Sequence, residues 1–280
     1  MTKRSFHYHA CAHALSGHLT RPLQHVIEVQ AGTTLPTTGG HGSARAENFR
    51  FNQTVSFDAA YSEVSGSETQ PEDGQIIHTT VATTAVENLN ILDVVTADRI
   101  VSRVSSSFEG LHAKKPLEGQ VLLVGSKFEN LRIAGYQVEV ELDHELFLEL
   151  GSFATVQERF KSRGSKLREM ATEALKLRGV DLDLPKELAP EGALLCSAVK
   201  QVHFKDPGFG PSGGKFDHPG VKRIGRHAFH VVDFGDVFLA EVLCQHGRKT
   251  LTMLRVELGS PNGGGFVAAE ARVNGWPPWG

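Results

Sequence analysis

The sequence predicts a mainly β protein, an antiparallel sandwich or barrel with a two-helix insertion near residues 152–178. Three observations favour this class. Apolar and polar residues alternate with a period of two over much of the chain, which is typical of half-buried strands. A five-residue pattern recurs at nearly equal intervals, and one segment changes to a period near 3.6. We expect a single β-rich domain over residues 1–280.

The first predicted strand carries metal-ligand side chains at every second position: His7, His9, Cys11 and His13. Because alternate side chains of a strand share a face, these four lie on one side. The other side is apolar and consists of Phe6, Tyr8, Ala10, Ala12 and Ala14. The row is therefore either a ligand surface or the solvent-facing side of a strand whose back faces the core.

The recurring pattern reads Glu-Asn-apolar-polar-apolar. Its copies begin at Glu47, Glu87 and Glu129, which lie 40 and 42 residues apart. This spacing suits hairpins stacked in one sheet system, a propeller-like arrangement or a solenoid. If the repeat is structural, we expect each Asn to satisfy local backbone groups at the entry to a strand. A chance similarity is the competing explanation.

Further strands are expected from apolar, β-branched composition at 75–86, 93–104, 227–244, 249–258 and 266–273. The third and fourth of these segments are separated by Gln245-His246-Gly247-Arg248. A short polar connection that contains glycine predicts a hairpin. The C-terminal half is therefore expected to add strands to the same sheet system.

Residues 143–179 are expected to form a helical insertion between strands. Ser165 is a candidate N-cap for the second of the two main helices, Gly179 is a candidate stop, and residues 143–150 suit a short lead-in helix. One apolar stripe follows the helical period and consists of Phe153, Val156, Phe160, Leu167, Met170, Ala174 and Leu177. The Gly/Pro-rich segment 206–225 is expected to be a loop.

Charge and composition limit the classes of binding partner that we expect. The net charge of −3 provides no general attraction to nucleic acid or to an anionic membrane. No apolar run approaches the roughly 20 residues that a bilayer-spanning helix needs. Cys11, Cys196 and Cys244 are odd in number and form no CxxC pair, which fits a reducing compartment. We therefore expect a cytoplasmic protein that binds neither nucleic acid nor membrane.

A metal site on the N-terminal strand would need ligands from elsewhere in the fold. His7 and His13 are about 20 Å apart at the rise of a strand, so two of the four side chains can reach one ion but all four cannot. The third ligand would come from another strand, for example His227 or His230, or from a carboxylate such as Asp233 or Glu241. A divalent transition metal would be the cofactor of such a site.

Two functions of different classes remain open. The first is a non-enzymatic, soluble β-scaffold that binds a protein partner or associates with itself, with Trp276 and Trp279 as interface anchors. The alternative is a metal-binding protein or metal-dependent enzyme of cupin-like style that uses the His/Cys strand inside a barrel. The first predicts that the row faces solvent or a neighbouring subunit. The second predicts a cavity and a convergent third ligand.

Overall fold

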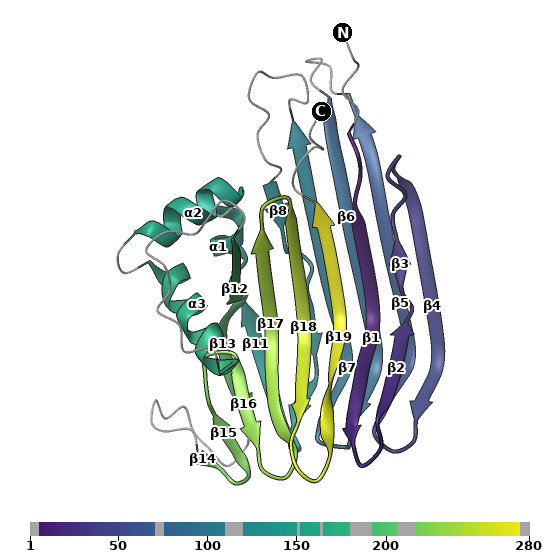
Figure 1. Ribbon diagram of the computed structural model, residues 1–280, viewed down its shortest axis with the longest axis vertical. Helices are drawn as coiled ribbons and strands as arrows, with labels where there is room; N and C mark the ends of the chain where they lie inside the picture. Colours follow the sequence, from purple (N-terminus) through teal and green to yellow (C-terminus); the bar gives the residue numbers. More distant parts are fainter. Residues whose placement is uncertain are drawn as a thin grey trace.

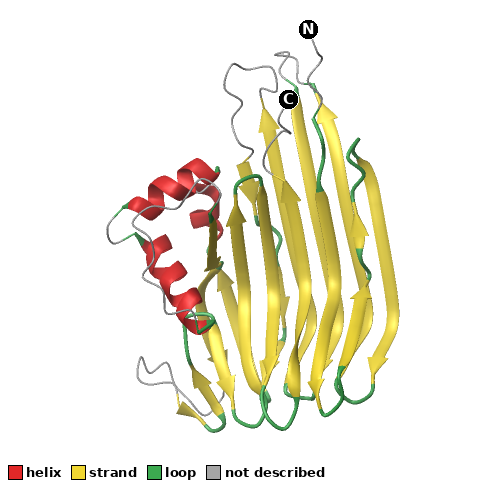
Figure 2. Cartoon of the chain, in the orientation of Figure 1, coloured by secondary structure: helices red, strands yellow, loops and turns green. Residues whose placement is uncertain are grey.

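Two antiparallel sheets pack face to face and form an open sandwich (Figures 1 and 2). The computed structural model describes residues 6–70, 76–109, 120–149, 152–162, 165–179, 192–205 and 217–274. The sandwich and its helical insertion confirm the predicted fold class, and the barrel alternative is wrong because the two sheets do not close. No helix in the described part of the chain is long and apolar enough to cross a bilayer.

The larger sheet combines the N-terminal strands with the C-terminal third of the chain. In spatial order it contains β14 (Asp217–His218), β15 (Val221–Arg223), β16 (Ala228–Val231), β17 (Gly235–Gln245), β18 (Arg248–Leu258), β19 (Gly263–Asn274), β1 (Ala10–Arg21) and β2 (His25–Gln30). Off this path, β12 (Ala193–Ser197) pairs with β17, and β3 (Thr33–Thr34) pairs with β1. The long-range pairing of β1 with β19 joins the two ends of the chain.

The smaller sheet is largely a meander of consecutive hairpins. In spatial order it contains β13 (Val199–Lys205), β11 (Tyr136–Leu142), β10 (Leu131–Ile133), β7 (Val95–Glu109), β6 (Ile77–Ile91), β5 (Val55–Thr69) and β4 (Gly40–Phe51). Two short strands, β8 (Gln120–Leu122) and β9 (Lys127–Glu129), also pair with β7. The core lies between this sheet and β1, β18 and β19 of the larger one.

The alternation of inward and outward side chains inverts once along each long strand. In β6 the inward residues before Asn88 include Ala82 and Val86, whereas after it they are Leu89 and Ile91. Asn88 has φ 53°, a left-handed conformation that Asn tolerates better than most residues. A residue in this conformation changes the side on which the following residues point.

The same inversion forms a polar row across the smaller sheet. Asn48 and Asn130 also have positive φ, at 52° and 49°. Asn88 donates to Asp58 Oδ2 at 2.8 Å, and Asn130 donates to Asp98 Oδ2 at 3.1 Å. The Glu-Asn pattern is therefore a true structural repeat of one hairpin per copy. The propeller and solenoid alternatives are wrong, because the hairpins belong to one sheet of a sandwich. The expected position of each Asn at the entry to a strand is also wrong: Asn48 and Asn88 lie within paired strands, and Asn130 lies between β9 and β10.

The larger sheet inverts without a polar ladder. Ala240 in β17 and Ala269 in β19 have φ 48° and 55°. In β17, Val237 and Leu239 point into the core before Ala240, and Val242 and Cys244 do so after it. As a result, residues three positions apart across Ala240 share the outer face. This matters for the site described below.

The helical insertion lies beside the sandwich, where α3 packs against β12 (Figure 1). It consists of α1 (His144–Glu149), α2 (Phe153–Lys161) and α3 (Lys166–Leu177). Ser152 and Ser165 cap α2 and α3 by accepting the N–H groups of Thr155 and Arg168. The predicted apolar stripe is buried at Phe153, Val156, Phe160, Leu167, Met170 and Ala174.

The two lateral edges of the sandwich differ. At one edge the chain passes from β12 in the larger sheet through Ala198 to β13 in the smaller one, and the helices lie alongside. Ala198 donates to Ala240 O at 2.7 Å and accepts from Asp143 N at 2.7 Å, which ties the crossing in place. At the other edge β2 and β4 end their sheets (Figure 1).

Two expectations about the C-terminal half need correction. The segment 227–244 is interrupted by a turn between β16 and β17, where Asp233 has φ 59°. The described part of the expected 206–225 loop contains the short strands β14 and β15, because Val221 is buried and anchors them to β16. Residues 206–216 lie outside the described chain. The predicted hairpin at Gly247 and the last strand, here β19, are confirmed.

Candidate functional site

The four side chains of the His/Cys row share one face, as their spacing predicted, and in the structure this face points outward. His7 and His9 are exposed, Cys11 and His13 are half-buried, and Phe6, Tyr8, Ala10, Ala12 and Ala14 are buried on the opposite side. Regular strand pairing begins only at Ala10, so the first two histidines precede β1. The row therefore lies on the outer side of the larger sheet.

The neighbours of this row are polar side chains of β19 and β1. Arg272 Nε donates to Cys11 Sγ at 3.0 Å, and His13 lies 3.3 Å from Ser16 Oγ and 4.0 Å from Glu270 Oε1. Burial is the main cause that lowers the pKa of His13. Glu270 opposes the shift and Arg272 adds to it. His13 is thus mostly neutral at pH 7.

The candidate third ligands do not reach the row. His227 and His230 belong to the β16 region, four strand spacings from β1, which is about 19 Å at the usual spacing. His227 is buried, and His230 Nδ1 lies 2.7 Å from Asp236 Oδ1. Among the described residues, no three His, Cys, Asp or Glu side chains are grouped so that they could hold a metal ion. Trp276 and Trp279 lie outside the described residues.

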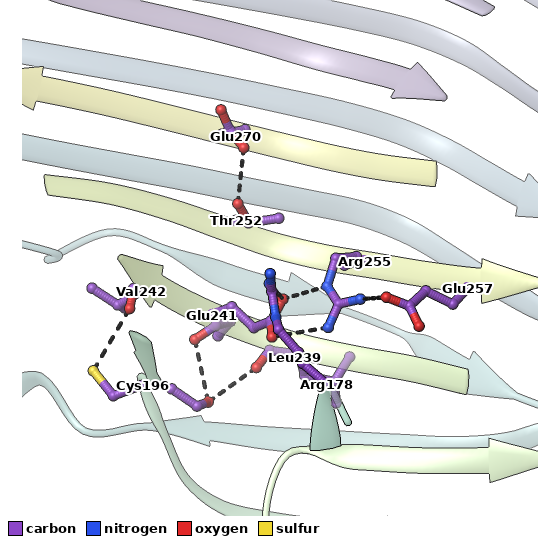
Figure 3. Close-up of polar contacts among 11 residues, drawn as sticks. Arg178, Cys196, Leu239, Glu241, Val242, Thr252, Arg255, Glu257 and Glu270 are labelled. Carbon is purple, nitrogen blue, oxygen red and sulfur yellow. Dashed lines mark hydrogen bonds and ion pairs between the residues drawn. The ribbon is translucent and has the colours of Figure 1, made fainter. Parts of the chain in front are cut away.

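A buried charge cluster marks the outer face of the larger sheet instead (Figure 3). The side chain of Glu241 is only 4% exposed. Arg255 donates to it twice, from Nε to Oε2 at 2.6 Å and from Nη2 to Oε1 at 3.1 Å. Arg178, just beyond α3, donates from Nη2 to Oε2 at 3.1 Å. A carboxylate this well paired can remain charged inside a protein.

The inversion at Ala240 creates this cluster. Phe238 and Glu241 are three residues apart on β17, yet Arg255 contacts both. The Arg255 guanidinium carbon lies 3.7 Å from the Phe238 ring centre, a cation–π contact. An uninterrupted strand would place Phe238 and Glu241 on opposite faces.

Electrostatics keep Glu241 ionised and His227 neutral. Burial works to raise the pKa of Glu241, but the hydrogen bonds and charge of Arg255 and the charge of Arg178 outweigh it, and the pKa is lowered. Burial likewise lowers the pKa of His227, against the opposing influence of Glu241 and Glu173. A carboxylate held as its anion is suited to binding and positioning rather than to proton donation.

Glu241 begins a row of polar side chains that crosses four strands. Glu241 pairs with Thr252, Thr252 with Glu270, and Glu270 with His13 in the strand register. Thr252 Oγ1 donates to Glu270 Oε2 at 3.0 Å (Figure 3). The row thus connects the charge cluster to the predicted His/Cys strand. Of its members, sequence reasoning singled out His13, and named Glu241 only as one carboxylate among several.

A cavity of about 520 Å³ lies over this row. Its floor includes Glu241, Thr252 and Glu270, and its walls come from α3 and β12. A second, more open hollow of about 570 Å³ adjoins it on the same face and shares Arg255 and Val267. The signal in the sequence was slight: Glu241 is the one charged residue in the otherwise apolar run from Val237 to Cys244.

Comparison with known proteins identifies a family for this chain. No curated protein and no solved structure matches the chain. A family model matches residues 6–245, a range that includes the smaller sheet, the helical insertion, the His/Cys row and Glu241. The chain therefore belongs to the family described as Domain of unknown function (DUF8256).

Proposed function

We propose that this protein is a non-enzymatic β-sandwich scaffold that associates with a second copy of itself, by pairing β4 of one protomer with β4 of the other. The observation that carries the proposal is the free edge of β4. This strand is 12 residues long, contains no proline, and has β5 as its single partner among the described strands. A long edge with unpaired N–H and C=O groups is a template for another strand.

The other sheet exposes apolar side chains at the same edge. Leu23, Val26 and Val29 are three of the six large apolar residues that are exposed among the described residues. His25 stacks on Phe51, and Thr33 lies beside Gly42. Val29 is between His25 and Thr33 in the chain, so it is level with the middle of β4. Backbone and apolar groups thus favour the same interface.

The register of the pair follows from the side-chain pattern of β4. Outward residues up to Glu47 are His41, Ser43, Arg45 and Glu47, and the pattern inverts at Asn48. In an antiparallel pair of identical strands, a two-fold axis at Ala44 places outward residues opposite outward residues and inward residues opposite inward residues over 40–47. It places Glu47 opposite His41 and Arg45 opposite Ser43. An axis at Arg45 would instead place Arg45 opposite its own copy, which is unfavourable.

Sedimentation velocity and a cysteine pair test this proposal. We expect a species of twice the 30.4 kDa chain mass. In a Cys11→Ser background, Ala44→Cys should form a covalent dimer on mild oxidation, because residues directly opposite have Cβ atoms about 4.5–5.5 Å apart. Ser43→Cys is the matched control, since its copy would be diagonal and about 7–8 Å away.

The possible results of these experiments either support or contradict the β4 interface. A dimer that is cross-linked at position 44 and not at 43 supports both the interface and its register. A monomer at all concentrations, or equal cross-linking at both positions, contradicts the proposal. Cys196 and Cys244 are buried and do not interfere. Cys11, Cys196 and Cys244 form no disulfide in the described part of the chain, which supports placing the scaffold in the reducing environment of the cytoplasm.

A further inference from the structure

The 520 Å³ cavity is built by elements far apart in the chain. Ala171, Leu175 and Arg178 form the side toward α3, and residues 193–195 of β12 form a second side. The floor is the outer face of β17, β18 and β19. A concave site of this size suits a small organic molecule. It is distinct from the β4 edge on which the proposed self-association rests.

The charges in the cavity are unevenly matched. Arg178 and Arg255 face the carboxylate of Glu241, and Arg255 Nη1 also contacts Glu257. Two cations are thus balanced by two anions. An added anion would therefore meet no uncompensated positive charge here.

Glu270 has no such balance. Among the described residues, its carboxylate accepts from Thr252 Oγ1 at 3.0 Å, and its one ion-pair contact is with His13 Nδ1 at 4.0 Å. His13 is mostly neutral at pH 7 because burial lowers its pKa. The side chain of Glu270 is one quarter exposed, so it is reachable from the cavity. It offers a negative charge that a cationic ligand can complete.

Apolar side chains make up most of the rest of the lining. Leu175 comes from α3, Leu195 from β12, and Leu243 and Val267 from the sheet. These side chains provide a place for a hydrocarbon group next to the carboxylate. The combination resembles amphipathic recognition, in which one polar contact fixes orientation and apolar walls supply affinity.

We propose that this cavity binds a small primary amine, with its ammonium group on Glu270 and its hydrocarbon part against the leucines. Inorganic cations are disfavoured, because the described residues group no three carboxylate, histidine or thiol ligands for a metal. Thr252 orients the carboxylate by its hydrogen bond. Arg178 and Arg255 keep Glu241 occupied, so that Glu270 is the acceptor for the ligand.

Isothermal titration calorimetry with 2-phenylethylamine is the first test, at neutral pH and with the full chain. The neutral analogue 2-phenylethanol and the anion 3-phenylpropanoate are compared under the same conditions. We expect saturable binding of the amine and at least about tenfold weaker binding of the alcohol, the size of one charge-assisted hydrogen bond. Equal binding of amine and alcohol, or no saturable binding, overturns the proposal.

Two variants locate the binding. Glu270→Gln keeps an acceptor for Thr252 but removes the charge, and should reduce the amine affinity by at least about tenfold. Glu63→Gln, an exposed site on the other sheet, is its matched control and should bind as the parent does. Ala193→Trp adds a ring to an exposed position of the cavity lining and should abolish binding.

The thermal unfolding midpoint without amine tells a folding defect from a binding defect. Ala193→Trp should melt as the parent does, so its loss of binding reports the cavity. Retained amine binding in both Glu270→Gln and Ala193→Trp would contradict the assignment. The oligomeric state of Glu270→Gln and Ala193→Trp, measured in parallel, should not change, because the cavity is remote from β4.

Discussion

At the scale of the residue, His227 shows how burial sets a protonation state. Its side chain is 1% exposed, and its Nε2 atom has no hydrogen-bond partner among the described residues. Glu241 and Glu173 favour the charged ring, whereas Arg255 and Arg226 oppose it, and burial dominates all four. The folded protein therefore holds this imidazole neutral, with its pKa below the ordinary value of 6.5.

This lowered pKa predicts a specific loss of stability in acid. As the pH falls below 6.5 the unfolded chain takes up a proton that the folded chain refuses, so the free energy of unfolding declines until the folded pKa is reached. Each pH unit in that window removes at most about 1.4 kcal/mol per group. We expect His227→Gln to reduce the difference between urea unfolding free energies at pH 7.5 and 5.5. A His227→Gln variant that keeps the full difference of the parent protein would contradict the assignment.

At the scale of the element, the inversion rows decide which side chains reach the core. Strand positions were predicted well in two of the long strands: the expected 93–104 overlaps β7, and the expected 266–273 lies within β19. The Glu-Asn repeat was visible in the sequence, but the inversion of the side-chain pattern was not. A positive φ at Ala240 or Ala269 leaves no signature in the hydrophobic pattern. Regular alternation would place Phe238 and Glu241 on opposite faces, so the pattern alone did not reveal the charge cluster.

The left-handed Asn residues make a testable claim about β6. In Asn88→Gly and Asn88→Ala the hydrogen bond to Asp58 is lost equally, but only alanine bears the steric penalty of positive φ, about 1–2 kcal/mol. The alanine variant should therefore be less stable in urea unfolding than the glycine variant by about 1 kcal/mol. At Thr83, on the same strand with ordinary backbone, the order should reverse, since glycine weakens strands by about 0.5–1 kcal/mol. The same order at both sites would show that Asn88 is not constrained.

At the scale of the whole molecule, the sequence could predict layers but not closure. Alternation is the same in a sandwich and in a barrel, and the difference depends on whether the edge strands β2 and β4 pair with each other, which no local pattern decides. The site was hidden for the same reason. Arg178, Glu241 and Arg255 are brought together by the packing of the α3 region against two strands, and no local spacing relates them. The residues of the His/Cys row were placed on one shared face in advance, because they follow one another along a single extended segment.

The asymmetry of the two edges leads to a prediction about assembly. Val29 lies at the open edge and is 56% exposed, and Val232 lies at the turn between β16 and β17 and is 58% exposed. Two-fold symmetry places every substitution in the interface twice, and lysine at a strand edge opposes pairing. Val29→Lys should therefore raise the dimer dissociation constant in sedimentation equilibrium by at least about tenfold, equivalent to about 1.4 kcal/mol. Val232→Lys, matched in exposure and remote from β4, should leave the constant unchanged. If both variants weaken the dimer alike, the open edge is not the interface and the contact lies nearer the β16–β17 turn.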